Sequence, residues 1–404
     1  MTYGIVVPLL VVAALILAEI ACRWWIRHRS GYYVWTPGTR LDLRLDRDIF
    51  PEGEHQVRFK INADGERGGD VRRDEKGLYR VLVTGGSAAE CFALDQPTSW
   101  PGALERLLSA PEALDALGAR RVHVGCVARS NVASADLDLI LERVLPRYRR
   151  LSTIILMVGA GDVVQWLEEG APPSLPPAFV PPGKVFQCHP ERHFGWKPKQ
   201  WALVEVGRRL RQLWFRPWSV LEKGSGAWYA AARRMRAEAK EIRTETGDPT
   251  PMVERFEHHL RQSLRRAKVH ADRVLVVRQP CFEKERYTAE ELSHFWHGGV
   301  GRAWREKISV YYSLDVVNRL MGLVDARAAA LAESCGVEQL DLRRVLEPSL
   351  RNYFDYTHFT AAGAAVIAQA VAGAVLQVQP EAKAAPARPR TAAPLFRSPA
   401  QSGA

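Results

Sequence analysis

Paired cysteines and nucleotide-binding glycine motifs are both missing from this sequence. The six cysteines are scattered through 404 residues and none stands in a C-x-x-C pair, which excludes a disulfide framework and the common structural zinc sites. The glycine turn at 85–86 is followed by neither the G-x-x-x-x-G-K-[ST] nor the G-x-G-x-x-G pattern of phosphate-binding loops. We therefore expect no metal, no nucleotide and no other cofactor.

The chain also lacks the signatures of a nucleic-acid-binding protein. Its formal net charge is +11, carried mostly by arginine, and such a charge favours anionic partners, either lipid headgroups or nucleic acid. Zinc-finger spacing, an RNA-binding motif and a compact basic motif are all missing. We therefore expect no nucleic-acid partner, and anionic lipid is the favoured interpretation of the charge.

Basic residues are missing from the first four positions, MTYG, although a long apolar run follows. Residues 5–26 are almost entirely apolar, and about 20 such residues span a bilayer as a helix. A cleaved signal peptide needs a basic start, and a lipoprotein signal at Cys22 needs an aliphatic residue where Glu19 stands. We predict an uncleaved transmembrane anchor over 5–26, with Trp24 and Trp25 at the membrane interface.

The charges that flank this anchor favour one orientation. Arg23, Arg27 and Arg29 lie at its carboxyl end, and nothing basic precedes it. The positive-inside rule then places the rest of the chain on the cytoplasmic side. The expectation is a single-pass membrane protein whose main domain faces the cytoplasm.

Beyond the anchor, the sequence alternates between strand and helix patterns. Residues 27–78 form a polar lead-in with one predicted strand, and residues 79–379 form the main domain. Alternating β and α elements favour a three-layer α/β/α fold around a mostly parallel five-stranded sheet. An Ala-, Pro- and Arg-rich tail over 380–404 has the composition of a disordered segment. The five predicted strands are Tyr79–Thr84, Arg121–Gly125, Thr153–Val158, Arg273–Arg278 and Val337–Leu340.

A basic, aromatic insertion interrupts the main domain at 171–268. It opens with the proline-rich segment 171–183, which cannot form regular structure, and continues with arginines interleaved with tryptophans, among them Arg208, Arg211 and Trp214. One interpretation is a helical subdomain with a solvated basic face. The other is a surface that contacts anionic lipid, with tryptophan at the interface and arginine reaching the headgroups.

The stretch VLVTGGSAAE places Ser87 directly after a predicted strand and two glycines. Glu90 and Asp95 would repel a phosphate, so a nucleotide loop is excluded on charge as well as on pattern. Two interpretations stay open from this stretch alone. Ser87 is either a turn serine that caps the following helix or a nucleophile that needs a base from elsewhere in the chain.

A base and an orienting carboxylate stand together near the carboxyl end, in YFDYTHFT. Asp355 and His358 are three residues apart, so a single turn lets the carboxylate hold one imidazole nitrogen while the other nitrogen faces Ser87. Thr360 is placed to cap the helix that follows. The three side chains therefore form a candidate Ser-His-Asp triad.

These motifs resemble those of the SGNH/GDSL hydrolase superfamily, in the expected order over roughly 79–379. GGS at 85–87 resembles the first block, DYTH with Asp355 and His358 resembles the last, and FKINADGERG at 59–68 is similar to a lead-in of membrane-anchored bacterial members. The resemblance implies a flavodoxin-like α/β/α fold, a Ser87 nucleophile and no metal or cofactor. It implies an esterase or acyltransferase acting on a carboxylic ester, either an acyl or an O-acetyl group.

The resemblance implies an oxyanion hole built from Ser87 and two further positions. At both of those positions the sequence departs from the family pattern. Ala128 stands where the second block has a donating glycine, and Gly161 stands where the third block has asparagine. Loss of one side-chain donor lowers turnover by about 10²–10³. Arg129 and Asn131, on the neighbouring loop, are candidate substitute donors.

Gly161 also supports a different class of function. A chain that has lost this donor could be a catalytically weak or silent scaffold, serving as a membrane-tethered binding or assembly component.

The loop HFWHGGVGRAW at 294–304 has two histidines but no evident third metal ligand. Two interpretations of that loop stay open: it is part of the substrate side of the site, or it is an ordinary loop that leads into a helix.

Overall fold

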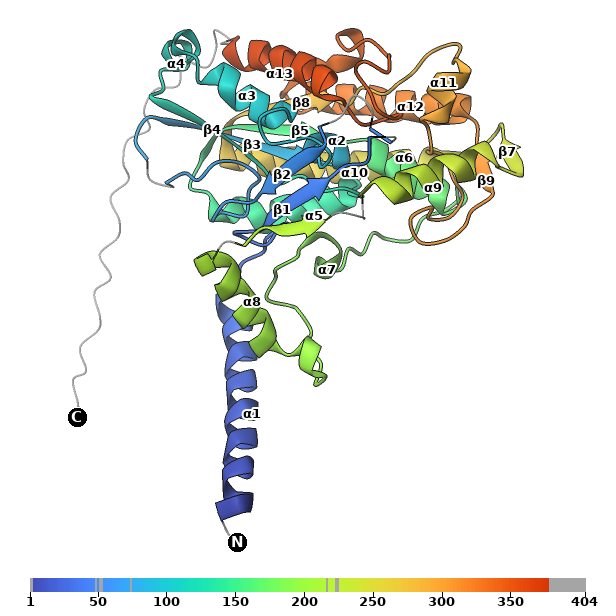
Figure 1. The fold of residues 1–404 in the computed structure, drawn as a ribbon. Helices are drawn as coiled ribbons and strands as arrows, with labels where there is room; N and C mark the ends of the chain where they lie inside the picture. Colours follow the sequence, from blue (N-terminus) through green and yellow to red (C-terminus); the bar gives the residue numbers. More distant parts are fainter. Residues whose placement is uncertain are drawn as a thin grey trace, which may run out of the picture.

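The computed structural model describes residues 3–377 except 48, 51–53, 73–74, 216 and 222–224. The tail predicted to be disordered, 380–404, lies outside the described residues. Figure 1 shows a layered main domain from which the amino-terminal helix projects.

The central sheet has five strands in the order β10-β8-β5-β3-β4, and every neighbouring pair is parallel. The predicted α/β/α fold with a five-stranded sheet is confirmed. Each strand begins and ends within two residues of its prediction, because short apolar runs bounded by polar segments mark buried parallel strands. The strands are β3 (Leu78–Gly85), β4 (Arg121–Cys126), β5 (Leu151–Met157), β8 (Ala271–Arg278) and β10 (Glu338–Asp341).

Helices cover both faces of this sheet. On one face α3 (Trp100–Leu108) packs against α13 (Ala361–Leu376), and on the other α10 (Thr250–His270) packs between α5 (Ser134–Val144) and α12 (Leu314–Ser334). The chain runs from β3 outward to β4 and then returns to β5, so the carboxyl ends of β3 and β5 form the topological switch point. Ligands of open α/β sheets bind at such a point.

The expected insertion, 171–268, is shorter in the structure. Helix α10 leads directly into β8 and packs against two helices of the main domain, so it is a core crossover helix. Its apolar stripe, which includes Phe256, Leu260 and Leu264, is fully buried. The inserted part therefore ends before Thr250.

The lead-in segment packs onto the main domain through a buried carboxylate. Glu66 accepts hydrogen bonds from Arg80 Nη2 at 2.9 Å, Tyr148 Oη at 2.6 Å and His123 Nε2 at 2.8 Å. Burial opposes ionisation of Glu66, but these partners outweigh it and lower its pKa. Arg67 also pairs with Cys126 in an antiparallel bridge, which extends the lead-in along the edge of β4.

The amino-terminal helix α1 (Tyr3–Arg29) is long and apolar enough to cross a membrane, with a mean hydropathy of 2.3 for the candidate span Val6–Arg29. Helix α8 (Ala202–Phe215) lies alongside it (Figure 1). The other helices are α2 (Ser87–Glu90), α4 (Pro111–Leu117), α6 (Ala160–Glu168), α7 (Pro182–Val185), α9 (Ser225–Ala237) and α11 (Ala289–Ser293). The other strands are β1 (Arg40–Arg44), β2 (Gln56–Lys60), β6 (Ser219–Leu221), β7 (Glu241–Arg243) and β9 (Val310–Tyr312), and the short 3-10 helices are Leu145–Arg147, Pro198–Gln200 and Leu342–Arg344.

Candidate active site

Ser87 is positioned by a tight turn at the carboxyl end of β3. Gly85 has φ +154°, and a Cβ there would lie 2.1 Å from the Met157 carbonyl oxygen on β5. Only glycine allows β3 and β5 to approach so closely at this point. Ser87 is then the first residue of α2, so its backbone N–H has no helical carbonyl partner, and its side chain lines a cavity.

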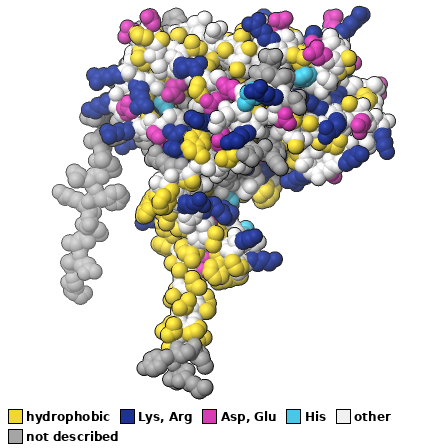
Figure 2. Space-filling model, in the orientation of Figure 1, with side chains coloured by type: hydrophobic (Ala, Val, Ile, Leu, Met, Phe, Trp, Pro, Cys, Tyr) yellow, Lys and Arg dark blue, Asp and Glu magenta, His cyan; other side chains and the backbone are white. Residues whose placement is uncertain are grey.

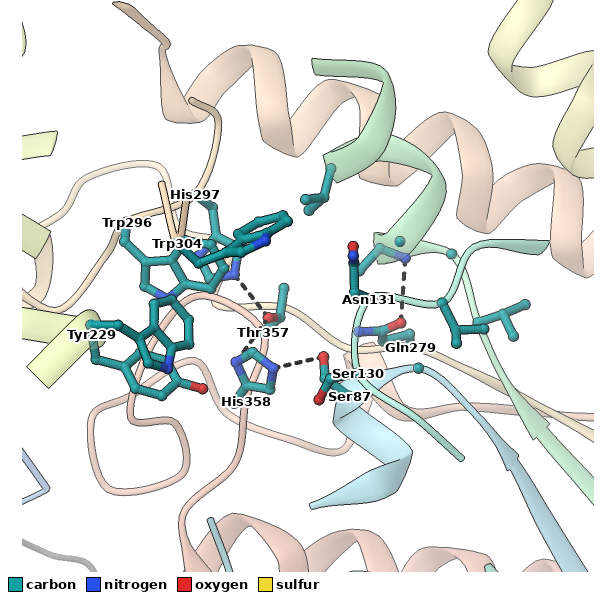
Figure 3. Close-up of a pocket in the computed structure, with 18 residues that line it drawn as sticks. Ser87, Ser130, Asn131, Tyr229, Gln279, Trp296, His297, Trp304, Thr357 and His358 are labelled. Carbon is teal, nitrogen blue, oxygen red and sulfur yellow. Dashed lines mark hydrogen bonds between the residues drawn. The ribbon is translucent and has the colours of Figure 1, made fainter. Parts of the chain in front are cut away.

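The structure brings Ser87, His358 and Asp355 together, as the sequence predicted they would lie. His358 Nε2 is 2.7 Å from Ser87 Oγ, and His358 Nδ1 is 2.7 Å from Asp355 Oδ2 (Figure 3). Phe354 stacks on the His358 ring, with centroids 5.4 Å apart. The imidazole therefore has one nitrogen at the serine hydroxyl and the other at a carboxylate.

Asp355 is fully buried, and both of its carboxylate oxygens accept hydrogen bonds. The backbone N–H groups of Thr357 and His358 donate to Oδ1 at 2.8 and 2.9 Å, and Trp296 Nε1 donates to Oδ2 at 3.0 Å. Burial alone would raise the pKa of Asp355, but the nearby His358 and His297 and these hydrogen bonds lower it overall. Asp355 is thus held as a carboxylate, in the state that orients an imidazole.

A second histidine, His297, lies beside the pair. Its Nε2 is 3.1 Å from Thr357 Oγ1, which in turn is 3.3 Å from His358 Nδ1. Burial lowers the pKa of His297 to about 3, so its imidazole is neutral in the physiological range. His297 therefore forms part of the wall of the site without adding a charge next to His358.

His297, Asp355 and His358 also offer three ligand atoms within 4.8 Å of one another. A cation there would have to displace the N–H donors of Trp296 and Thr357 that point at the Asp355 carboxylate. It would also take the His358 nitrogen that faces Asp355. The donor set of these described residues fits a hydrogen-bonded triad better than a metal site.

Gly161 lines the cavity, and the structure gives a reason for glycine at this position. A Cβ on Gly161 would lie 2.1 Å from the carbonyl oxygen of Val132 and 2.8 Å from its carbonyl carbon. The loop after β4 therefore fills the space into which an asparagine side chain at 161 would project. The position of this loop therefore explains why residue 161 carries no side-chain donor.

The same loop carries three of the predicted oxyanion residues to different places. Ala128 is buried and is not among the cavity-lining residues. Arg129 points away from the cavity, because its guanidinium donates to the carbonyls of Val34 and Val185. Asn131 alone of the three lines the cavity.

Asn131 has a backbone conformation that is uncommon outside glycine, with φ +61°. Asparagine tolerates this left-handed region better than most residues, and non-glycine residues held there cluster at functional sites. Figure 3 shows Asn131 beside Gln279, on the other side of Ser87 and His358 from the tryptophans. Sequence reasoning missed Gln279, because a lone glutamine after a strand carries no pattern.

Two buried carboxylates hold this loop in place. Glu90, on the same short helix as Ser87, accepts from both the backbone N–H and the hydroxyl of Ser130. Asp162, on α6, accepts from the backbone N–H of Ser134 at 2.9 Å and from its hydroxyl at 2.5 Å. Burial raises the pKa of Glu90, and it raises that of Asp162 to about 6. The loop is thus tied to the serine helix at one end and to α6 at the other.

The cavity has a volume of about 320 Å³ and lies at the carboxyl ends of the central strands. One wall is aromatic, formed by Trp228 and Tyr229 of α9 with Trp296 and Trp304 of the 294–304 loop (Figure 3). The 294–304 loop is therefore part of the cavity wall, as its substrate-side interpretation predicts. Helix α9 of the basic insertion covers this site, and its Trp228 lines the cavity.

No protein-family model and no curated protein matches the chain. Among solved structures, it is similar to the acetylxylan esterase Axe2 from Geobacillus stearothermophilus, at 12% identity and a TM-score of 0.38 over 74% of this chain and 95% of that one. It is also similar to a lipolytic protein of the G-D-S-L family from Veillonella parvula (8% identity, TM-score 0.39, 74% of this chain and 100% of that one). LAE5, an alpha/beta hydrolase from the metagenome of Lake Arreo in Spain, is similar at 13% identity and TM-score 0.39, over 74% and 97% of the two chains.

All three structures are at most 13% identical to the chain, so we base its proposed function on the contacts among its own residues.

Proposed function

We propose that the chain is a membrane-anchored SGNH/GDSL-type serine esterase or acyltransferase that acts on a carboxylic ester, carrying an acyl or O-acetyl group. The observation that supports this most directly is the continuous chain of contacts from Ser87 Oγ through His358 to Asp355. A nucleophile, a base and an orienting carboxylate in hydrogen-bond reach are the minimum set for acyl transfer through a covalent intermediate.

In the proposed reaction, His358 Nε2 takes the proton of the Ser87 hydroxyl as Oγ attacks the ester carbonyl carbon. The tetrahedral intermediate collapses, the bond to the alcohol oxygen breaks, and His358 returns the proton to the departing alkoxide. Water, or an acceptor hydroxyl, then gives its proton to His358 as its oxygen attacks the acyl-enzyme. The second tetrahedral intermediate collapses, the bond to Ser87 Oγ breaks, and His358 returns the proton to Ser87 as the acid or the new ester leaves. Asp355 stays ionised and stabilises the imidazolium at each stage.

We assign the oxyanion donors to the Ser87 backbone N–H and the side-chain amide of Asn131. Asn131 lines the cavity, whereas Ala128 does not line it and Arg129 is held by two carbonyls outside it. An amide there replaces in space the donor that the sequence lacks at Gly161. This assignment lets the chain be a competent enzyme in spite of Gly161.

Transfer to an acceptor hydroxyl is supported by a second cavity on the other side of the catalytic pair. It has a volume of about 530 Å³ and is lined by Ile49, Phe50, Leu350 and Tyr353, among others. A narrow gap lined by Ser87 and His358 lies between it and the first cavity, and shares residues with both. Two cavities on either side of this gap suit a donor and an acceptor. Adding a small alcohol to the assay would then divert product from acid to ester.

The membrane anchor belongs to the same proposal. We assign residues 5–26 to a single bilayer span, since α1 meets the length and hydropathy of such a helix. The arginines at its carboxyl end favour the cytoplasmic side for the main domain.

The test of the catalytic proposal compares the wild type with Ser87→Ala, both purified in detergent. We expect the wild type to label with a fluorophosphonate probe and to hydrolyse p-nitrophenyl acetate, and the variant to lose about 10⁴-fold or more in turnover. Equal labelling and turnover in the two proteins would leave the silent scaffold as the better description.

A further inference from the structure

Glu19 is a carboxylate in the middle of an apolar helix, and it is fully buried. Its oxygens accept from the backbone N–H groups of Ala202 and Leu203, at 2.8 and 2.9 Å, and from Arg23 Nε at 2.7 Å. Ala202 and Leu203 are the first two residues of α8, whose N–H groups have no partners inside that helix. Helix α1 therefore supplies the cap of α8 from its own side chain.

Further contacts hold α8 along the carboxyl-terminal half of α1. Arg209 donates to Ser30 Oγ at 2.8 Å, and Arg23 donates to the carbonyl of Gly195 at 2.6 Å. Ile26 is completely buried, whereas residues 6–17 of α1 are exposed. The two helices thus run in the same direction from Glu19 towards the main domain (Figure 1).

The outer side of α8 exposes large apolar side chains to an unusual extent. Trp214 is 77% exposed and Phe215 is 76% exposed, and Val204, Leu210 and Leu213 are each more than 40% exposed. In Figure 2 the apolar surface of α1 continues upward to the region of α8, where Lys and Arg side chains begin. A patch of this kind beside an apolar anchor marks a surface that meets lipid or protein.

Exposed cations surround this patch. They comprise Arg27 and Arg29 at the end of α1, Lys197 and Lys199 in the segment before α8, and Arg208 and Arg211 on α8 itself. Trp24 and Trp196 are exposed at the same level, with Arg23 stacked on Trp196. Tryptophan at the interface and long cationic side chains that reach the headgroups are the composition of a membrane-surface helix.

We propose that the exposed apolar and cationic surface of α8 contacts a bilayer containing anionic lipid, with α8 held beside the anchor by Glu19. The proposal rests on the membrane anchor proposed above and adds to it a second contact with an assigned lipid chemistry. The main domain is then fixed in height and tilt above the bilayer by two helices, and the cations of the patch select negatively charged headgroups.

The test uses the full chain reconstituted in vesicles of phosphatidylcholine, with and without phosphatidylglycerol. Trp214→Cys is labelled with a charged maleimide that does not enter the bilayer, and the wild type gives the background of native cysteines. Val269→Cys, which replaces an exposed residue of α10, is the matched control. We expect Trp214→Cys to react about tenfold more slowly in anionic vesicles, since each arginine near such a surface contributes roughly fivefold, and Val269→Cys to react equally in both.

Arg208→Gln with Arg211→Gln, added to Trp214→Cys, should remove most of that protection and leave hydrolysis of a soluble ester unchanged. Equal labelling in anionic vesicles, neutral vesicles and detergent would overturn the proposal. Protection that persists in detergent together with a doubled particle mass would assign the surface to a second copy of the chain and would overturn it too. Ester hydrolysis by the same samples reports separately on the catalytic proposal.

Discussion

At the scale of single residues, the sequence predicted the catalytic candidates but not their supporting contacts. Ser87, Asp355 and His358 could be found because each follows a strand and two of them share one turn. Asn131 could be suggested only by its nearness to the second block. Gln279 and Trp296 could not be predicted, because their places depend on how loops far apart in sequence meet above the sheet.

Asn131 offers the sharpest test of the oxyanion assignment. We expect Asn131→Gly to lower kcat by about 10²–10³ with little change in KM, since one side-chain donor to the transition state is lost. Glycine accepts the left-handed backbone at this position, so its effect isolates the loss of the amide. Asn131→Ala should show the same loss of kcat together with lower stability. Unchanged turnover in Asn131→Gly would remove this residue from the mechanism.

Asp162 should make stability depend on pH in an identifiable way. Burial raises its pKa to about 6 in the folded chain, above roughly 3.9 for an unfolded aspartate. The folded state therefore holds this proton more tightly, and the contribution to stability falls as pH rises from about 4 to about 6, by up to about 3 kcal/mol. Between those pH values the wild type should lose more unfolding free energy than Asp162→Asn, measured by urea denaturation. The same pH dependence in both proteins would contradict this.

At the scale of elements, periodic patterns predicted the strands of the central sheet well and the basic insertion poorly. The sequence grouped α8, α9 and α10 together because all three are rich in arginine. In the structure α10 is a core helix, α9 covers the active site and α8 lies beside α1. Composition reports charge, but it does not report which partner an amphipathic helix packs against.

Arg233 connects α9 to the catalytic loop and should affect substrate binding. Its guanidinium donates to the carbonyls of Phe354 at 2.9 Å and of His294 and Ile49 at 3.1 Å. Arg233→Met loses these bonds and loosens the aromatic wall, so we expect KM for a soluble ester to rise about tenfold with a smaller change in kcat. Arg234→Met, an exposed change on the same helix, is the control. A similar KM in all three proteins would show that α9 is held by other contacts.

At the scale of the whole molecule, the anchor and the main domain are coupled through α8. The sequence predicted a helix over 5–26 as a simple tether, because hydropathy gives length and says nothing about packing. The burial of Glu19 and Ile26 shows that the second half of α1 belongs to a folded contact. The residue that makes this contact is Glu19. In a hydropathy profile it is only a single charge that interrupts an apolar run, so its role in packing could not be predicted.

Removal of residues 1–29 should therefore expose α8 while leaving the main domain folded. Without Glu19 and Ile26, the first turn of α8 loses its cap and its packing, and we expect trypsin to cleave at Arg208, Arg209 or Arg211 early in digestion. The full chain in detergent should resist cleavage there, and both proteins should hydrolyse a soluble ester at similar rates. Resistance of the truncated chain to cleavage at these three sites would show that α8 is stable without the anchor.

The carbonyl of Val132 in the space beside Gly161 has a consequence for how this chain can change over time. A substitution that places asparagine at 161 would bring its Cβ within 2.1 Å of that oxygen, so a side-chain donor cannot enter at this position unless the loop moves first. Asparagine at 161 would therefore need a compensating change in the loop after β4, and single substitutions at 161 cannot supply it.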